Sequence, residues 1–370
     1  MFHMVRFLGE RFDIDLVAPA FEAVDEAKRL LQGSCREMEF VPPSPGSTRR
    51  RLLRLSPYET DPALAAAIRT RLARQCYAAV QVEKPAMLPY VPPDTPIPIV
   101  LDSWAFGLAG ILRALRYEPG MVARARNVLR LLRFSAFDAF CWPAIDSVLV
   151  VSEVDRQRCL RSCPGQRTLI VANGVDCTAI RPGACRDSGP PVLTFTGDMS
   201  FTPNVDAALF LASQIFPALR QVYADVELHL VGRKPDPRVR ALQGPGITVT
   251  GEVDQMLPYL HATTVYVAPH FTGAGTRTKI LEAMAAGLPI VTTSIGLEGI
   301  EALPGRAVLI ADDPSSMVTA ILKLLADPTQ RHLLGSAARR LAEERYDWRR
   351  CLAPLESLYT ALLASRTLPC

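Results

Sequence analysis

Long apolar runs are missing from this sequence. None of its apolar blocks approaches the roughly 18 consecutive residues that a membrane-spanning helix needs, because Arg, Asp, Pro or Gly interrupts each of them. The opening residues Met1 to Arg6 lead into an amphipathic pattern, without the basic-then-apolar order of a secretory signal peptide. The sequence therefore predicts a soluble protein of the cytoplasm, with peripheral binding at the inner membrane face as the alternative.

Paired cysteines at metal-ligand spacing are also missing. Nine cysteines are scattered over 370 residues, and only Cys159 and Cys163 lie close together. Without a second close pair, this usage indicates free thiols and no zinc site or disulfide framework. A basic motif interleaved with aromatics is absent too, and so are zinc-finger and helix-turn-helix signatures, so we do not expect nucleic acid as a partner.

The formal charge of +4 is unevenly distributed. Residues 1–185 contain 24 Lys+Arg against 19 Asp+Glu, which gives +5, and the remaining residues contain 17 against 18, which gives −1. A basic N-terminal half favours an anionic partner such as a phosphorylated lipid or a membrane surface. A solvated surface explains so small an excess equally well.

Length and hydropathy patterning predict two α/β domains. A chain of 370 residues with 49% hydrophobic residues is long enough for two cores. From Pro191 onward, short β-branched runs alternate with helical segments, which is typical of a parallel sheet covered on both faces. The predicted strands are 192–196, 226–231, 247–250, 264–268, 289–293 and 307–310. A helix is predicted over 203–222, with Thr202 as its N-cap.

The N-terminal half shows the same alternation less regularly. A turn-rich stretch, 41–47, separates elements there, and the Pro/Gly-rich stretch 181–191 is the predicted domain boundary. The predicted strands are 14–18, 78–82, 97–101, 147–151 and 169–172. The predicted helices are 4–11, 20–31, 62–74 and 121–140.

The segment most informative about function lies between Pro269 and Gly287. The strand 264–268 ends in a loop with Gly273 and Gly275, and this loop opens a helix. In an open parallel sheet, ligands bind where strands end and helices begin, because the free N–H groups of the first helical turn attract anions.

Two cations follow this loop. Arg277 and Lys279 lie at a helix N-terminus, where the helix dipole disfavours positive charge, so their placement calls for an anion such as a diphosphate. Glu282, three residues beyond Lys279, could accept hydrogen bonds from ribose hydroxyls. The alternative is that both cations are solvated and that Glu282 only pairs with Lys279.

These residues resemble a known donor-site signature. The pattern Gly-x-Gly-Thr-Arg-x-Lys-x-Leu-Glu-Ala-x-Ala-x-Gly-x-Pro-x-Val, over 273–291, is similar to that of retaining family-4 (group 1) glycosyltransferases, and more narrowly to a polysaccharide- and glycolipid-assembly subgroup. Further landmarks of the resemblance are the stretches 150–156, 172–176, 195–199, 203–207 and 231–233. It covers residues 145–350 well and the first 140 poorly.

The resemblance implies a GT-B fold, in which two Rossmann-like, doubly wound α/β domains face a cleft. Residues 1–184 would form the N-terminal, acceptor-side domain and residues 185–350 the donor-binding domain. Residues 351–370 would form a C-terminal helix that packs back toward the N-terminal domain. The chain opens on a helix, so the family's first strand is expected to be absent.

The candidate site residues follow from the resemblance, except Asp102, which is a candidate because it ends a predicted strand. Arg277, Lys279 and Asp102 are the candidate catalytic residues, and the donor-binding candidates are Gly197, Asp198, Arg233, Gly273, Gly275, Thr276, Arg277, Lys279 and Glu282. The family has two glutamates separated by seven residues in the loop, whereas this chain has Ala274 at the first position and Glu282 at the second. The Arg and Lys that usually follow the first donor-domain strand are replaced by Asp198-Met199-Ser200.

The N-terminal half offers few candidates for chemistry. Asp102 ends a predicted strand and either orients an acceptor hydroxyl or caps a helix. The only histidine in that half, His3, is assigned no role, and His270 beside the donor loop is either a ligand or an ordinary loop residue. The segment 121–133 reads as a basic amphipathic helix, which packs its apolar face on the sheet or lies on an anionic membrane.

The predicted function is sugar transfer from a UDP- or GDP-sugar to a hydroxyl acceptor on a glycan or a lipid-linked saccharide, with retention and without a metal or other cofactor. Two alternatives stay open. One is a catalytically impaired relative that binds the nucleotide-sugar without transferring it, and the other is a nucleotide-sugar epimerase of the same architecture.

Overall fold

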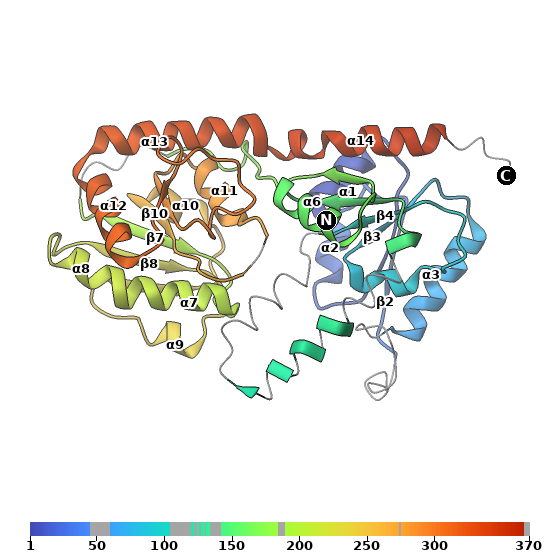
Figure 1. Cartoon of the computed structure of the whole chain (residues 1–370), viewed down its shortest axis with the longest axis horizontal. Helices are drawn as coiled ribbons and strands as arrows, with labels where there is room; N and C mark the ends of the chain where they lie inside the picture. The colour runs from blue at the N-terminus through green and yellow to red at the C-terminus, as the bar shows by residue number, and fades with distance from the viewer. Residues whose placement is uncertain are drawn as a thin grey trace. The chain divides into compact units, whose positions relative to one another are not determined.

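The chain folds into two compact units (Figure 1). The computed structural model describes residues 1–44, 60–103, 120–121, 124–125, 127–129, 131–133, 142–183, 189–273 and 275–365. Unit 1 comprises Met1–Ala172 and Leu352–Cys370, and unit 2 comprises Asn173–Cys351. The domain limits at 184 and 350 stay predictions.

Unit 2 is built on one continuous parallel sheet of six strands, in the order β12-β11-β10-β7-β8-β9. All six strands predicted from sequence are confirmed. β7, β10 and β11 are buried throughout, as expected of strands covered on both faces, whereas the edge strands β9 and β12 are only partly buried. The strands are β7 (Val192–Thr196), β8 (Glu227–Val231), β9 (Ile247–Gly251), β10 (Val265–Ala268), β11 (Ile290–Thr292) and β12 (Leu309–Ile310).

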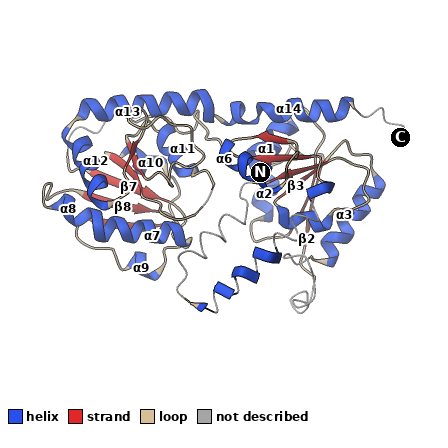
Figure 2. Ribbon diagram, in the orientation of Figure 1, coloured by secondary structure: helices blue, strands red, loops and turns tan. Residues whose placement is uncertain are grey.

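Helices cover both faces of this sheet (Figure 2). They are α7 (Thr202–Phe210), α8 (Phe216–Arg220), α9 (Pro237–Arg240), α10 (Leu257–His261), α11 (Thr278–Ala285), α12 (Pro314–Ala326) and α13 (Pro328–Leu341). A π-helical turn, Leu211–Ile215, separates α7 from α8, so the helix predicted over 203–222 is interrupted. The predicted cap is wrong: the N-cap of α7 is Phe201, and Thr202 is already helical.

The described residues of unit 1 form two separate parallel sheets. β1 (Asp15–Pro19) pairs with β2 (Glu37–Val41), and β3 (Val80–Glu83), β4 (Ile99–Asp102), β5 (Ser147–Val150) and β6 (Thr168–Ile170) form the second sheet in chain order. Five of these strands were predicted, and β2 was not. The helices are α1 (Phe2–Gly9), α2 (Val24–Leu30), α3 (Pro62–Arg74) and α6 (Glu153–Ser162), together with the 3-10 turns η2 (Pro85–Tyr90) and η3 (Trp142–Ala144).

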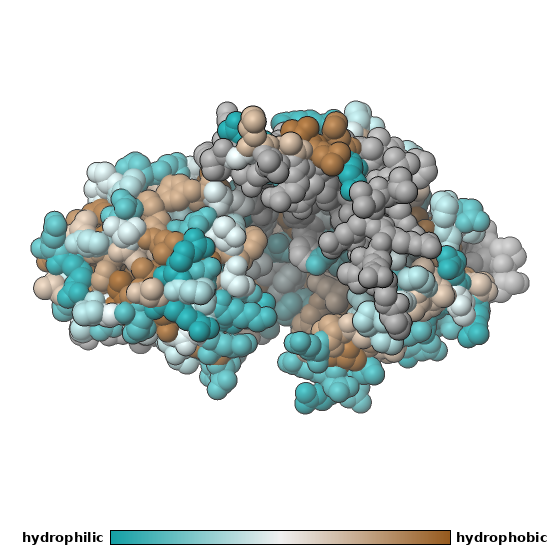
Figure 3. All heavy atoms as spheres, turned by 90° about the horizontal axis from the view of Figure 1, so that it is seen from below, coloured by the Kyte–Doolittle hydropathy of each residue, from teal (hydrophilic) through white to brown (hydrophobic). Residues whose placement is uncertain are grey.

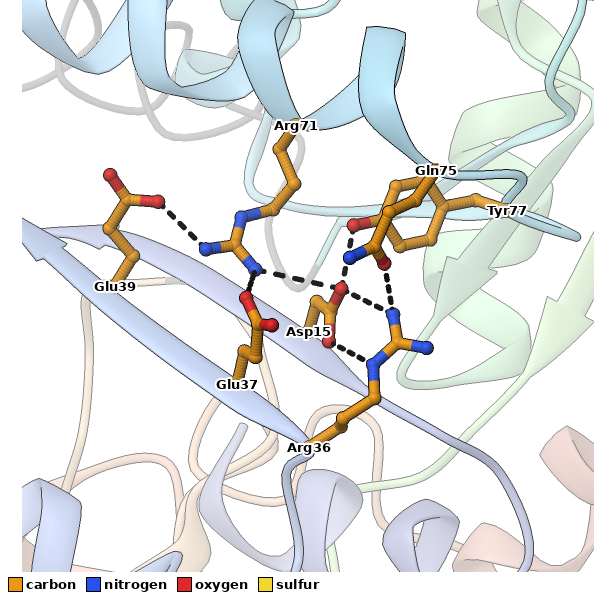
Figure 4. A network of polar contacts seen from close by, with 7 residues as sticks. All are labelled: Asp15, Arg36, Glu37, Glu39, Arg71, Gln75 and Tyr77. Carbon is orange, nitrogen blue, oxygen red and sulfur yellow. Dashed lines mark hydrogen bonds and ion pairs between the residues drawn. The ribbon is translucent and has the colours of Figure 1, made fainter.

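A polar network holds β1 and β2 against α3 (Figure 4). Arg36 donates two hydrogen bonds to Asp15, at 2.9 and 2.6 Å, and the Tyr77 hydroxyl donates a third at 2.6 Å. From α3, Arg71 donates to Glu37 at 2.6 Å and to Glu39 at 2.9 Å. The Asp15 side chain is only 1% exposed, so it depends on these donors for its charge.

The last helix of the chain is shared between the two units. Helix α14 (Trp348–Ala364) begins in unit 2 and continues into unit 1. No helix among the described residues is long and apolar enough to cross a bilayer. In the view of Figure 3, apolar residues lie in separate brown patches among hydrophilic ones.

The described residues of the 121–133 segment are helical, with several apolar side chains exposed. Val128, Leu129 and Leu132 are 46%, 57% and 62% exposed, whereas the polar Asn127 is buried. The expectation that this apolar face packs on the sheet is wrong for these three side chains. Residues 134–140 of the predicted helix lie outside the described part of the chain.

Candidate functional site

The candidate site lies where the strand order of unit 2 reverses. From β7, the chain places β8 and β9 on one side and β10, β11 and β12 on the other. The loops that follow the neighbouring strands β7 and β10 therefore both leave the sheet at the carboxyl ends of its strands, and they run in opposite directions. A crevice at this position is where open α/β sheets bind ligands.

Two glycines let the loops after β7 and β8 meet. Gly232 has a φ of +153°, and a β-carbon there would collide with the carbonyl oxygen of Gly197. A β-carbon on Gly197 would in turn press on the ammonium of Lys279 and on Asn204. Glycine at both positions therefore brings the backbone close to the cations of the site.

Lys279 reaches from the first turn of α11 back to the end of β7. Its ammonium donates a hydrogen bond of 2.6 Å to the Asn204 side chain and lies 4.6 Å from the ring centroid of Phe195. Among the described residues, no carboxylate forms an ion pair with it. An amide and an aromatic ring hold this cation in place without neutralising it.

A buried Asn–His pair supports Lys279. The sequence left His270 open as a ligand or an ordinary loop residue, and it gave no role to Asn204. The Asn204 side-chain oxygen accepts from Lys279 and, at 3.2 Å, from Nε2 of His270, while its amide donates to the Asp198 carbonyl at 2.8 Å. His270 is 1% exposed and its Nδ1 has no partner among the described residues. The available signal was an Asn in the first turn after β7 and a His directly after β10.

Arg277 organises the loop between β10 and α11. Its guanidinium donates to the carbonyl of Gly275 and, at 3.1 Å, to that of Thr272. Gly273 and Gly275 have φ values of +93° and +86°, which give the loop its tight course. Arg277 is the N-cap residue of α11, so the free N–H groups of this helix begin beside its charge. Ala274 lies outside the described residues.

The other donor-site candidates lie around the same loop. Thr276 Oγ1 is buried without a hydrogen-bond partner among the described residues. Burial raises the pKa of the Glu282 carboxyl, although the charge of Lys279 opposes that rise. Arg233 donates to Asp198 at 3.0 Å, and a hydrogen bond from Ser200 is the main cause of the lowered pKa of Asp198.

Burial controls the protonation of the two basic groups at the centre. Burial, and then the charge of Arg277, lowers the pKa of Lys279 to about 7, against smaller effects of Glu282 and Asp198. Burial, and then the charges of Lys279 and Arg277, lowers the pKa of His270 to about 3. His270 is therefore neutral at pH 7 and donates through Nε2. A nearby anion would raise the pKa of Lys279 and so favour its charged form.

Asp102 belongs to unit 1 and is not among these residues. It ends β4, is 6% exposed, and lies in register with Glu83 at the end of β3. Burial, followed by the charge of Glu83, raises the pKa of Asp102, and the ammonium of Met1 opposes this rise. This carboxyl can therefore hold a proton near neutral pH.

The arrangement is suited to a multiply charged anion. Arg277, Lys279 and the first N–H groups of α11 lie together at the end of the loop after β10, with the Lys279 ammonium beside Phe195 of β7. Cations beside a helix N-terminus are suited to binding phosphate groups. Within the described ranges, no three His, Cys, Asp or Glu side chains are grouped so that they could hold a metal ion.

Comparisons with known proteins point to one class. Residues 190–327 match the family model for glycosyl transferases group 1. A phosphatidyl-myo-inositol mannosyltransferase of Mycolicibacterium smegmatis is 26% identical over 247 residues, which are 63% of this chain and 62% of the mannosyltransferase. The chain thus aligns with less than two thirds of that relative's length.

Solved structures with the same fold cover nearly the whole chain. Sucrose-phosphate synthase from Thermosynechococcus elongatus superposes with a TM-score of 0.73 at 18% identity, covering 98% of this chain and 92% of that one. Anabaena HepE, solved in complex with UDP and glucose, gives 0.66 at 15% identity, covering 97% and 95%. The predicted GT-B fold is thereby confirmed. Residues 190–327, which match the model for glycosyl transferases group 1, contain the loops after β7 and β10 and helix α11.

Proposed function

We propose that this protein transfers a sugar from a nucleoside-diphosphate sugar to a hydroxyl acceptor, with retention at the anomeric carbon and without a metal. The donor is a UDP- or GDP-sugar, and the acceptor is a glycan or a lipid-linked saccharide. The donor diphosphate binds at the loop between β10 and α11.

The observation that carries the proposal is the environment of Lys279. Its ammonium lies at the carboxyl end of β7 with only an amide and an aromatic ring as close partners, and no carboxylate among the described residues pairs with it. An unneutralised cation with a pKa near 7 gains both charge and a partner when a diphosphate enters. Its location at the strand-order reversal supports the same ligand.

The chemistry follows from where charge develops. As the glycosidic bond to the leaving nucleotide breaks, negative charge grows on the diphosphate, and Lys279, Arg277 and the α11 N–H groups stabilise it. Preorganised electrostatics of this kind contributes heavily to catalysis. Glu282 is positioned one turn along α11 to accept hydrogen bonds from ribose hydroxyls.

The acceptor side is assigned to unit 1. Asp102, with its raised pKa, orients the acceptor hydroxyl and can accept its proton as the new bond forms. A lipid-linked acceptor agrees with the name of the mannosyltransferase relative and with the exposed apolar residues of segment 121–133, which would contact an anionic membrane. The UDP in the HepE complex supports a nucleotide donor.

The direct test is nucleotide binding by Lys279→Met. Because a hydrogen bond to a charged group contributes about 1.5–3 kcal/mol, we expect this variant to bind UDP-sugar or GDP-sugar roughly tenfold to a hundredfold more weakly in calorimetry. Lys323→Met, which removes an exposed lysine of α12, is the matched control and should bind like the parent chain.

Unchanged affinity in Lys279→Met would reject the phosphate site. Sugar transfer to an acceptor extract, followed with a labelled donor, then separates an active enzyme from a relative that only binds nucleotide-sugar. If Asp102→Asn keeps full donor affinity and loses transfer, the acceptor-side role is supported, whereas full transfer activity would reject it.

A further inference from the structure

Arg339 connects three parts of unit 2 that are far apart in the chain. It lies in the last turn of α13, and its side chain is 16% exposed. The guanidinium donates to the carbonyls of Cys177 at 2.8 Å and of Ile180 at 2.6 Å, and also to the carbonyl of Ala285. A further hydrogen bond, at 2.7 Å, goes to the carboxylate of Glu343. One side chain therefore ties the segment that enters unit 2 to the end of α11.

The bond from Arg339 completes the C-terminal end of α11. The last four carbonyls of a helix have no partners within the helix. Backbone amides of residues 286–288 satisfy three of them, those of Glu282, Ala283 and Met284. The fourth, that of Ala285, accepts from Arg339, and the helix dipole also favours a cation at this end. Arg339 thus fixes the end of α11 that lies opposite the donor loop.

Two glycines allow backbone to pack directly on this helix end. α13 packs on α11 (Figure 1), and a β-carbon on Gly335 of α13 would collide with the carbonyl oxygen of Gly287. Gly287 has a φ of +70°, and a β-carbon there would lie 3.3 Å from Pro182. Because no side chain intervenes at these contacts, a shift of α11 at this end must displace α13 or Pro182.

The segment that meets α11 here is the connecting segment, residues 173–183, the first part of unit 2 after the chain leaves unit 1. It contains a compact turn. The Asp176 carboxylate accepts from the amides of Thr178 at 2.9 Å and Ala179 at 2.8 Å, and the Asp176 carbonyl accepts from Ile180 at 2.9 Å. These bonds are local, so Arg339 is what ties the turn to the donor helix.

We propose that Arg339 is a positioning residue that couples the donor loop to the connecting segment. Helix α11 has eight residues, about 12 Å, so its two ends move as one body. A diphosphate bound at its first turn orders the helix, and Arg339 extends that order to the carbonyls of Cys177 and Ile180. The inference rests on the proposed function, because it needs the donor to bind at the N-terminus of α11.

Such a coupling acts in both directions, so a connecting segment held by Arg339 also favours donor binding. The proposed transfer needs groups of both units, and this segment carries the chain from unit 1 into unit 2. Donor binding would therefore reduce the freedom of that connection while the sugar is transferred.

Hydrogen exchange with and without nucleotide tests the coupling. UDP or GDP, whichever calorimetry shows to bind more tightly, is added at a saturating concentration. Slower exchange of the Lys279 amide, in the first turn of α11, then reports that the donor loop is occupied. The amides of Thr178, Ala179 and Ile180 should exchange at least about fivefold more slowly in the complex than in the free chain, which is the lower end of typical coupling between sites.

Arg339→Met should keep the protection of Lys279 but lose the slowing at the three amides of the connecting segment. The matched control is Arg331→Met, because Arg331 lies on the same helix and donates to the carbonyls of Leu324 and Leu325 at the end of α12. This control should retain both effects. Arg339→Lys keeps the charge but lacks the planar fork that spans the carbonyls, so it should lose most of the slowing even if Arg339→Met does not fold.

The ratio of exchange rates in the free and bound chain separates coupling from stabilisation. A residue that only stabilises unit 2 would change exchange in both states and leave this ratio as it is. The proposal is overturned if Lys279 is protected while the three amides are not, if the slowing survives in the Arg339 variants, or if Arg331→Met loses it equally. Binding of neither nucleotide would reject the donor site, and this inference with it.

Discussion

The two units use the same short, parallel, apolar strands but close their sheets differently. In unit 2 the central strands β7 and β10 are paired on both sides, and the loops after them pack tightly enough to enclose a lysine beside a histidine. In unit 1 the sheet is divided, and a network of arginines and carboxylates connects β1 and β2 to α3 (Figure 4). A continuous sheet can position a charged site by backbone geometry, whereas a divided one depends on side-chain ion pairs.

Gly232→Val should lower the stability of unit 2, and this is the largest of the expected effects. The new side chain would collide with the Gly197 carbonyl, a backbone atom that cannot rotate away, and its φ of +153° is one that L side chains rarely adopt. We expect a loss of about 3 kcal/mol or more in the stability of unit 2, with donor binding lost as well. Chemical denaturation followed by hydrogen exchange in β7 and β8 measures it.

Gly251→Ala is the matched control. Gly251 ends β9 with a φ of +70°, but a β-carbon there meets no atom within 4 Å. This variant should lose only the roughly 1–2 kcal/mol of a left-handed backbone. Equal losses in the two variants would show that tight loop packing is not what distinguishes unit 2.

Arg71→Met should weaken unit 1 by an intermediate amount. The change leaves Glu37 and Glu39 without their hydrogen-bond donor and removes a cation 3.6 Å from the buried Asp15. We expect a loss of about 2 kcal/mol in unit 1 and no change in unit 2. Thermal unfolding read out separately for the two units by hydrogen exchange checks this.

Arg74→Met, at an exposed position of the same helix, is the control and should lower the stability of unit 1 by less than about 0.5 kcal/mol.

The dependence of stability on acid pH is a second measurement of the same network. The pKa of Asp15 is lowered, mainly by its hydrogen bond from Arg36. The ionised Asp15 therefore stabilises unit 1 at any pH above the usual pKa of an aspartate, and this contribution is lost as the pH falls through the lowered pKa. An Arg71→Met chain as stable as the parent would mean that β1 and β2 are held by packing alone.

The sequence was most informative where burial alone decides structure. The described strands of unit 2 were each predicted to within two residues. Its central strands β7, β10 and β11 are buried throughout, and such strands need continuous apolar runs. Strand β2 was missed because Glu37 and Glu39 give it a polar face, and their partner Arg71 lies far along the chain.

The site was predictable only in part, because some of its residues come together from positions far apart in the chain. Arg277 and Lys279 follow from the loop and helix in which they occur. Asn204 and His270 are 66 residues apart, and they meet because β7 and β10 are neighbours in the sheet. Strand order of this kind has no local sequence signal.

The pH dependence of donor binding should give the smallest effect. Lys279, with a pKa of about 7 in the free protein, must be charged to bind the diphosphate, so the complex takes up a proton. Affinity for a UDP-sugar, whose diphosphate does not titrate in this range, should therefore fall about tenfold between pH 6 and pH 8, roughly 1.4 kcal/mol, because the charged fraction of Lys279 falls by that factor. Calorimetry at each pH, in buffers of different ionisation enthalpy, measures both the affinity and the proton taken up.

The surrounding groups allow this titration to be assigned to Lys279. His270, with a pKa of about 3, stays neutral throughout the range, and Arg277 stays charged, which leaves Glu282 and Asp198 as the other titratable neighbours. Lys279→Arg keeps a permanent charge and should bind with a flat pH profile, while Lys279→Met should bind weakly and also without pH dependence. If affinity still falls with pH in both variants, the proton taken up on binding belongs to Glu282 or to a group elsewhere in the protein. Lys279 would then already be charged before the donor binds.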